Sequence, residues 1–322
     1  MPIEVTSPDL QPDLGQRLGD LFPDDPTIVA RLVALQGTPG RIEPESLQRL
    51  ISSAESFPGS YNPYRGVLYM LAILAAQGEA GWQSFQTITG LLSFGKPGDG
   101  FHTNCANAVS TSLHFGARLP QNKRGRIPWF IMTGGRVPLG NPQWRTAGSL
   151  KNALENAAWF IDERYQVISF HPIEEKTFVF TGNSRKTQPF DRTEMLNTLR
   201  PGDLVFWAAQ HVAMIVGFGG AETQDAEGNV RPFYLRYRDA LEEAARRLNV
   251  DRSAERTDGE LEKELRRADS EIVLWVADHS YPGSKQPITH PRPITGMRVF
   301  NFSGEIKEVQ YVRVDYTDPP QG

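Results

Sequence analysis

The chain has 322 residues, of which 39% are hydrophobic and 22% charged, a composition typical of a soluble protein with one large domain or two smaller ones. Its net charge of −4 gives no electrostatic reason to expect binding to nucleic acid or to an anionic membrane. The only cysteine, Cys105, cannot form an internal disulfide, so the fold does not depend on an oxidising compartment.

The sequence contains no recognisable targeting or membrane-spanning segment. Its first residues, MPIEVTSPDLQPDL, lack the basic region and the apolar stretch of a secretory signal. The longest apolar run, residues 66–76, is too short to span a bilayer. We therefore expect a soluble protein that is made in the cytoplasm and does not insert into membranes. Export by a specialised secretion system that reads no N-terminal signal stays open.

Residues 1–95 are predicted to form a helical N-terminal region. Apolar residues recur at helical spacing after Pro26 and after Pro44, and again over Arg65–Gln77. The last of these segments is apolar on nearly all sides, so we expect it to be buried. A fourth helix is expected over Trp82–Phe94. No residue here suggests chemistry, so the region is interpreted as structural or as a contact for a protein partner.

The sequence around Cys105 predicts the start of a helix. The glycine-rich segment before it, Phe94–Phe101, has neither the spacing of a phosphate-binding loop nor a preceding strand. Asn104 is a favourable N-cap residue, and Gly116 is a favourable residue just past a helix end. Cys105 should therefore lie in the first helical turn.

That position bears on the reactivity of the thiol. The helix dipole and the unpaired backbone N–H groups of a first turn stabilise a thiolate and lower the pKa of the thiol. The same N–H groups can bind the oxyanion that forms on an attacked carbonyl. A lone cysteine is more commonly a small buried hydrophobic residue, so a nucleophilic role for Cys105 requires a base as well.

The middle of the chain is predicted to be less regular. A helix is expected over Ser149–Phe160, followed by a strand at Tyr165–Phe170 and its partner at Lys176–Phe180. The basic run Lys123–Arg126 is interpreted as a solvated loop. His171, which precedes a proline at the end of a strand, is interpreted as structural.

The segment Leu199–Phe218 predicts a β-hairpin. The turn Pro201–Asp203 starts one apolar run, and a second apolar run begins at His211. Both runs are apolar on both faces, which favours strands that are covered on each side. A histidine at the mouth of such a hairpin would be held rigidly, as a general base must be.

Two further features follow the hairpin. The highly charged stretch at residues 239–268 predicts a pair of helices inserted into the domain, with the charges most simply on a solvated face. A role in covering the active site stays open. The run Glu271–Ala277 predicts a strand, and a second hairpin is expected from Met297–Phe302 and Glu308–Val314.

The chain therefore offers a nucleophile, a base and a third polar residue, in that order. Cys105 and His211 are the first two, and the third is Asp278 or His279 at the end of the strand Glu271–Ala277. Strand alternation points Asp278 and His279 to opposite faces, so only one can reach His211. We favour Asp278, because a carboxylate both orients an imidazole and stabilises its charged form.

These motifs resemble those of the NlpC-like cysteine peptidases and their relatives, the CHAP amidases. The resemblance lies in Asn104–Ala106, in the run Pro201–Trp207 and in the run His211–Gly217, which is similar to the family's GDLVFF…HVGIY-G hairpin. The family usually has Asp-Cys-Ser where this chain has Asn-Cys-Ala. The resemblance implies an α+β, papain-like domain over residues 96–322, with a central antiparallel sheet and a nucleophile helix.

The activity implied by the resemblance is amide hydrolysis through a thioester, on peptidoglycan peptides. No cofactor is expected, and no histidine and carboxylate spacing in the sequence indicates a metal site. The Cys105 backbone amide would hold the oxyanion. A second oxyanion or substrate contact from His102, Thr103 or Asn104, just upstream, stays open beside a purely structural role for that loop. Other functions stay open for the same residues: a protein-directed protease or deamidase, an acyltransferase, or a catalytically inactive papain-like module that binds partners.

Overall fold

The structure is a computed structural model that describes most of the predicted elements. The described residues are 14–36, 41–80, 105–119, 147–157, 164–182, 184–207, 211–248, 258–278, 290–294, 298–300 and 306–316. Several sequence predictions lie outside them: the helix over Trp82–Phe94, the basic run Lys123–Arg126, and the candidate site residues His102, Thr103, Asn104 and His279.

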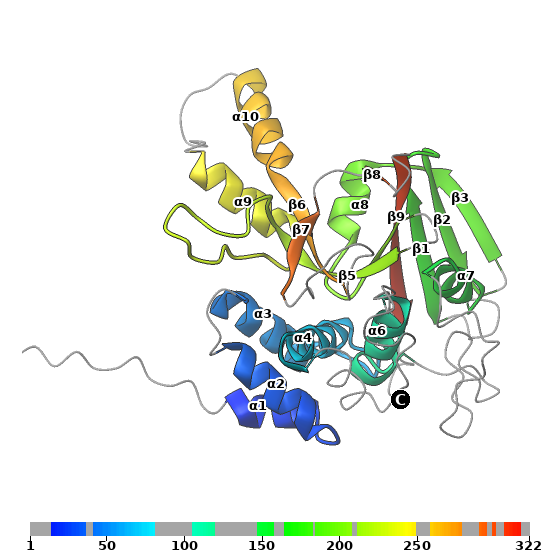
Figure 1. The fold of residues 1–322 in the computed structure, drawn as a ribbon. Coiled ribbons are helices and arrows are strands. Elements are labelled where there is room, and N and C mark those ends of the chain that lie inside the picture. Colours follow the sequence, from blue (N-terminus) through cyan, green and yellow to red (C-terminus); the bar gives the residue numbers. More distant parts are fainter. Residues whose placement is uncertain are drawn as a thin grey trace, which may run out of the picture.

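The protein combines helices with an antiparallel sheet, which confirms the predicted α+β class (Figure 1). The described helices are α1 (Leu14–Leu21), α2 (Pro26–Gln36), α3 (Pro44–Ser56), α4 (Pro63–Ala80), α6 (Cys105–Thr111), the π-helical turn η1 (Ser112–Gly116), α7 (Ala147–Ala157), α8 (Arg192–Thr198), α9 (Tyr237–Arg247) and α10 (Asp258–Ser270). The described strands are β1 (Tyr165–His171), β2 (Lys176–Thr181), β3 (Ser184–Pro189), β4 (Leu204–Trp207), β5 (His211–Gly220), β6 (Ile272–Ala277), β7 (Arg292–Ile294), β8 (Arg298–Phe300) and β9 (Ile306–Tyr316).

The strand order of the sheet is β3-β2-β1-β9-β4-β5-β6-β7, with β8 paired to β9, and every described pairing is antiparallel. The predicted hairpin is β4 and β5, in which Trp207 pairs with His211 at the mouth. Strand β6 lies directly beside β5. The sheet therefore brings the start of β5 and the end of β6 to the same edge.

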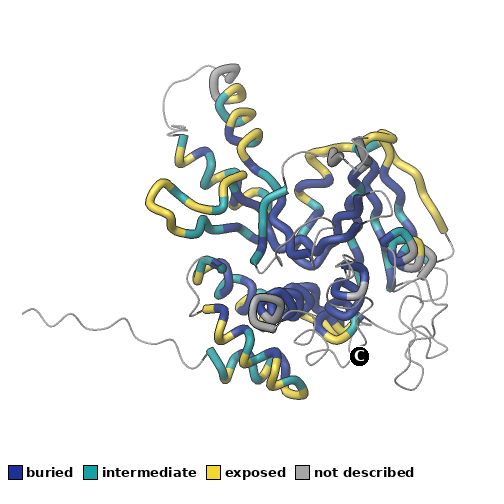
Figure 2. Tube along the Cα trace, in the orientation of Figure 1, coloured by how far each residue is buried: buried dark blue, intermediate teal, exposed yellow. Residues whose placement is uncertain are grey.

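Helices cover both faces of the central strands, as the two-sided apolar pattern of the hairpin predicts. Alternate β5 residues, Val212 and Met214, join a core formed with α4, α6 and α7. Their neighbours Ala213 and Ile215 join a second core formed with α8 and α9. In Figure 2 the strands at the centre are dark blue, and exposed residues gather on the outer sides of the helices. Each face of β5 packs on a different set of helices, so a one-residue slip would disrupt the packing on both faces.

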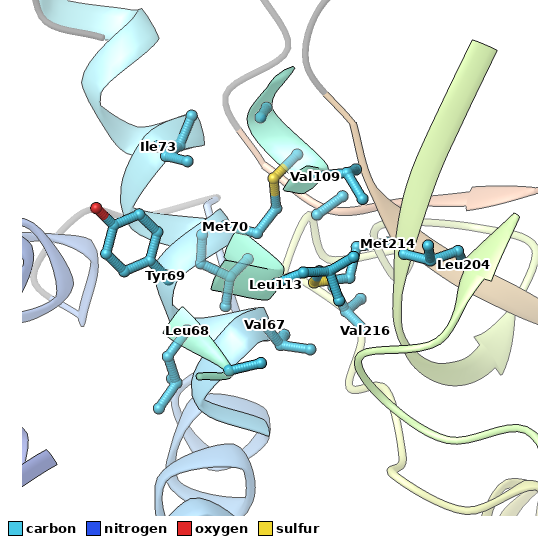
Figure 3. Packing of buried hydrophobic residues seen from close by; sticks show 14 of the residues in the cluster. Val67, Leu68, Tyr69, Met70, Ile73, Val109, Leu113, Leu204, Met214 and Val216 are labelled. Carbon is cyan, nitrogen blue, oxygen red and sulfur yellow. The ribbon is translucent and has the colours of Figure 1, made fainter. Parts of the chain in front are cut away.

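Helix α4 is the buried helix predicted at Arg65–Gln77. Figure 3 shows its side chains Val67 and Met70 packed with Leu113 of η1 and with Met214 of β5. The helix also lies very close to the end of η1: a Cβ atom added to Gly116 would be 2.6 Å from the Cβ atom of Tyr69. Contact at this distance requires glycine at position 116.

The N-terminal helices are also hydrogen-bonded to the segment that follows the hairpin. Ser46 Oγ accepts from the Phe233 backbone N–H at 3.1 Å and lies 3.2 Å from the Phe233 carbonyl oxygen, while its hydroxyl also lies 2.7 Å from the Glu43 carboxylate. Arg49 donates to the same carbonyl at 3.0 Å. The apolar residues of α1 to α4 belong to one continuous core with those of α6, α7 and the sheet.

The inserted pair of helices predicted from the charge pattern is present as α9 and α10. Helix α9 packs on the face formed by β5 and β6, with Ala240 in the core. Helix α10 ends at Ser270 and leads into β6 at Ile272, whereas Asp278 follows the other end of that strand. The described helices of the insertion thus join the sheet at the end away from Asp278.

Four described elements were not predicted from the sequence: α1, β3, α8 and β7. Strand β3 has the sequence SRKTQP and is exposed throughout, so it carries no apolar alternation. Strand β7 is three residues long and contains a proline. Helix α8 is seven residues long, and its start depends on Asp191, whose side chain accepts hydrogen bonds from the N–H groups of Thr193 and Glu194.

We expect Gly116→Ala to destabilise the protein by about 1–3 kcal/mol, because the added methyl group overpacks the contact between η1 and α4. The free energy of unfolding in urea measures this effect. The matched control is Gly19→Ala in α1, where an added Cβ meets no atom within 4 Å. The control should be neutral or stabilising by up to about 1 kcal/mol. Equal effects of the two substitutions would contradict the close approach of the helices.

Candidate active site

Cys105 is the first residue of α6 and is buried, with 4% of its surface exposed. Helix α6 packs against β5, and its residues Ala108 and Val109 lie in the same core as Val212 and Met214. His211 is the first residue of β5 and is also buried. The packing of α6 on β5 therefore brings the first residue of the helix to the first residue of the strand.

A hydrogen bond links His211 to Asp278, the residue that follows β6. Nε2 of His211 lies 2.8 Å from Oδ2 of Asp278, and the carboxylate is completely buried. Of the two ring nitrogens, this contact occupies Nε2. The thiol interacts with the His211 ring and with the backbone N–H groups of Val212 and Ala106. Cys105, His211 and Asp278 thus form a continuous buried chain of contacts.

The surroundings of the thiol favour its ionised form. Burial alone would raise the pKa of Cys105, because a thiolate is poorly solvated in a protein interior. Attraction to the His211 ring, together with hydrogen bonds from that ring and from the Val212 and Ala106 backbone, outweighs burial and lowers the pKa below its usual value.

The pKa of His211 moves in the complementary direction. Burial opposes its charged form, but the negative charge on Cys105 and the hydrogen bond to Asp278 raise the pKa to about 10. The pKa of Asp278 lies well below its usual value: burial would raise it, and the hydrogen bond and charge of His211, followed by Arg292, outweigh that effect. At neutral pH these shifts favour a thiolate on Cys105, an imidazolium on His211 and a carboxylate on Asp278.

Arg292 is a fourth member of the cluster, and sequence reasoning missed it. Its Nε lies 3.1 Å from Oδ1 of Asp278, and its Nη2 lies 2.8 Å from Oδ2. Strand β7 places it there, because Arg292 pairs with Val276, two residues before Asp278 on β6. The one sequence signal for this contact is the short run Arg292–Ile294, which follows the strand that ends at Ala277. Its central residue is a proline, which is unfavourable in strands, so the run was not predicted as a strand.

The structure brings Cys105, His211 and Asp278 together, and of the two candidates for the third residue it places Asp278 against His211. His279 and the candidate oxyanion residues His102, Thr103 and Asn104 lie outside the described residues. His171 lies elsewhere, buried on β1 with its Nε2 3.0 Å from Ser169 Oγ.

The described residues contain no group of three or more histidine, cysteine, aspartate or glutamate side chains arranged to hold a metal ion. Within the same part of the chain, no helix has the length and apolar character needed to cross a membrane. No protein-family model, curated protein or solved structure matches the chain. The interpretation of the site therefore depends on its geometry and on the sequence motifs.

The thiolate of Cys105 should persist below the usual cysteine pKa of about 8.5. Because the chain has one cysteine, the thiolate absorbance at 240 nm, with Cys105→Ser as the reference, reports this residue alone. In His211→Ala, burial without the imidazolium should move the titration to about 8.5 or above. A wild-type titration near or above pH 8.5 would contradict the ion pair.

Asp278→Asn and Arg292→Gln should affect the same titration differently. The first substitution removes the charge that supports the imidazolium, so the Cys105 titration should move up by about one to three pH units. The second removes a cation that shares the Asp278 carboxylate with His211, so it should produce no such upward shift. Similar upward shifts in both variants would contradict this expectation and would show that the support of the imidazolium by Asp278 depends on Arg292.

Proposed function

We propose that the protein is a cysteine hydrolase that cleaves amide bonds through a thioester intermediate. The observation that carries this proposal is the buried chain of contacts from Cys105 through His211 to Asp278. A nucleophile, a base in contact with it and a carboxylate that orients the base are the three parts that acyl transfer by a cysteine requires.

The reaction would proceed in two halves. The thiolate of Cys105 attacks the amide carbonyl, while its former proton resides on His211. The backbone N–H of Cys105 would stabilise the oxyanion. His211 then donates its proton to the departing amine as the C–N bond breaks, which leaves a thioester. His211, now neutral, takes a proton from a water molecule as its oxygen attacks the thioester carbonyl. The C–S bond breaks, the carboxylic acid is released, and the Cys105 thiolate and the His211 imidazolium are restored.

The arrangement of elements supports a papain-like, NlpC-type domain. A cysteine begins a helix that packs on an antiparallel sheet, and the histidine and the carboxylate come from adjacent strands. This is the order of parts that the motif resemblance implies.

The energetic cost of the cluster supports an active enzyme over an inactive binding module. Asp278 is wholly inaccessible, His211 is nearly so, and burying charged groups is costly even when they are paired. A carboxylate and an imidazole whose pKa values are strongly displaced in opposite directions are typical of catalytic sites. A module that only binds partners would have no need of them.

The proposed substrates are peptidoglycan peptides, as the sequence resemblance to NlpC-like peptidases suggests. Incubation of the full chain with purified peptidoglycan should release new amino groups, detected by amine derivatisation and mass spectrometry of the soluble fragments. Cys105→Ala and His211→Ala should each reduce the rate by about 10³-fold or more.

The outcome distinguishes a wrong substrate from a wrong mechanism. If wild-type protein releases no amine while iodoacetamide alkylates Cys105 faster than free cysteine at pH 7, the peptidoglycan proposal is wrong and another amide is the substrate. If wild-type protein and Cys105→Ala release amines equally, the cysteine mechanism itself is wrong.

A further inference from the structure

A polar cavity lies at the opposite end of β4 from His211. It has a volume of about 380 Å³ and is lined by Tyr64 of α4, the end of α8, Arg313 of β9 and the start of α9. Four of its lining residues are arginines, Arg200, Arg236, Arg238 and Arg313, and among the described lining residues the only acid is Asp239. This concentration of positive charge contrasts with the net charge of −4 of the whole chain.

The two inner arginines share one carboxylate. Arg200 Nη2 lies 2.5 Å from Oδ1 of Asp315, and Arg313 Nε lies 2.6 Å from Oδ2 of the same residue. The buried Asp203 also interacts with both arginines, and burial raises its pKa to about 7, so it offsets part of their remaining charge. The surplus positive charge at the cavity therefore comes mainly from the two other arginines, Arg236 and Arg238. Nε of Arg200 is buried and has no hydrogen-bond partner among the described residues.

The two outer arginines are available to a ligand. Arg236 and Arg238 are exposed, and within the described part of the chain their side chains make no ion pair and donate no hydrogen bond. Arginine side chains in such a position present paired N–H groups that match the oxygens of a phosphate.

The start of α9 adds to the positive potential. This eleven-residue helix begins at Tyr237, and its N-cap residue, Arg236, makes no side-chain capping hydrogen bond. The backbone N–H groups of the first turn, which also lines the cavity, therefore lack the acceptor that a serine or aspartate cap would supply. The exposed Asp239 offsets one of the four arginine charges.

We propose that this cavity binds the phosphate group of a small ligand. Paired guanidinium groups and the start of a helix converge on it, and its volume lies within the range of small-molecule sites. The cavity and the cluster of Cys105, His211 and Asp278 lie at opposite ends of β4, so the proposal does not depend on the proposed hydrolase activity. A ligand there would bind at a site separate from the reacting amide.

Calorimetric titration of the full chain with pyrophosphate, at constant ionic strength, tests the proposal. Wild-type protein should show saturable binding at one site. Arg236→Gln and Arg238→Gln should each weaken the binding about tenfold, since each removes a charge-assisted contact. The control is Lys186→Gln, which removes one exposed charge on β3 and should leave the affinity unchanged. Inorganic phosphate should compete with pyrophosphate, whereas acetate at the same concentration should not.

Three results would overturn the proposal. The first is the absence of saturable pyrophosphate binding to wild-type protein. The second is an equal loss of affinity in Lys186→Gln and the two arginine variants, which would indicate attraction by overall charge only. The third is equal competition by acetate, which would assign the cavity to carboxylates. Circular dichroism of each variant establishes that it is folded, and both arginines are exposed, so their replacement should leave the fold intact.

Discussion

The interaction on which the site depends is the buried hydrogen bond between His211 and Asp278. A neutral histidine buried alone would lose its affinity for protons and could not hold the proton of a neighbouring thiol. The Asp278 carboxylate raises the pKa of His211 instead, and the Cys105 thiolate raises it further. Each charge in the row of Cys105, His211 and Asp278 thus stabilises its neighbour. Arg292 completes the row, and its charge adds to the larger effect of His211 in holding the pKa of Asp278 below its usual value.

The sheet makes this contact a consequence of the fold. Strands β5 and β6 are hydrogen-bonded neighbours that run in opposite directions, so the first residue of one meets the residue that follows the other. Helix α6 lies on the same strands through its apolar face, which carries Cys105 to the same edge. Apolar burial on both faces of β5 holds its register, and therefore holds His211. The stability of the core and the geometry of the site thus depend on the same residues.

Much of this arrangement could be predicted from the sequence, because its parts carry strong local signals. The two-sided apolar runs around His211 predicted β4 and β5, and the periodicity of Arg65–Gln77 predicted the buried helix α4. Strand alternation predicted that only one of Asp278 and His279 could reach His211, and the ability of a carboxylate to orient and stabilise an imidazolium favoured Asp278. Arg292 could not be found in this way, because its strand is short and its contact with Asp278 depends on which strand lies beside β6. The cavity lined by Arg200, Arg236, Arg238 and Arg313 could not be predicted either, because four separate elements of the fold contribute to its lining.

The protonation state of His211 at neutral pH tests the central claim most directly. The ring nitrogens of the six histidines are observable by ¹⁵N NMR, and His211→Gln assigns the signal of this residue. We predict that both ring nitrogens of His211 carry protons at pH 7, and that Cys105→Ala lowers the pKa of the ring by removing the thiolate. A neutral His211 ring at pH 7 in the wild-type protein would contradict the thiolate–imidazolium pair and the mechanism built on it.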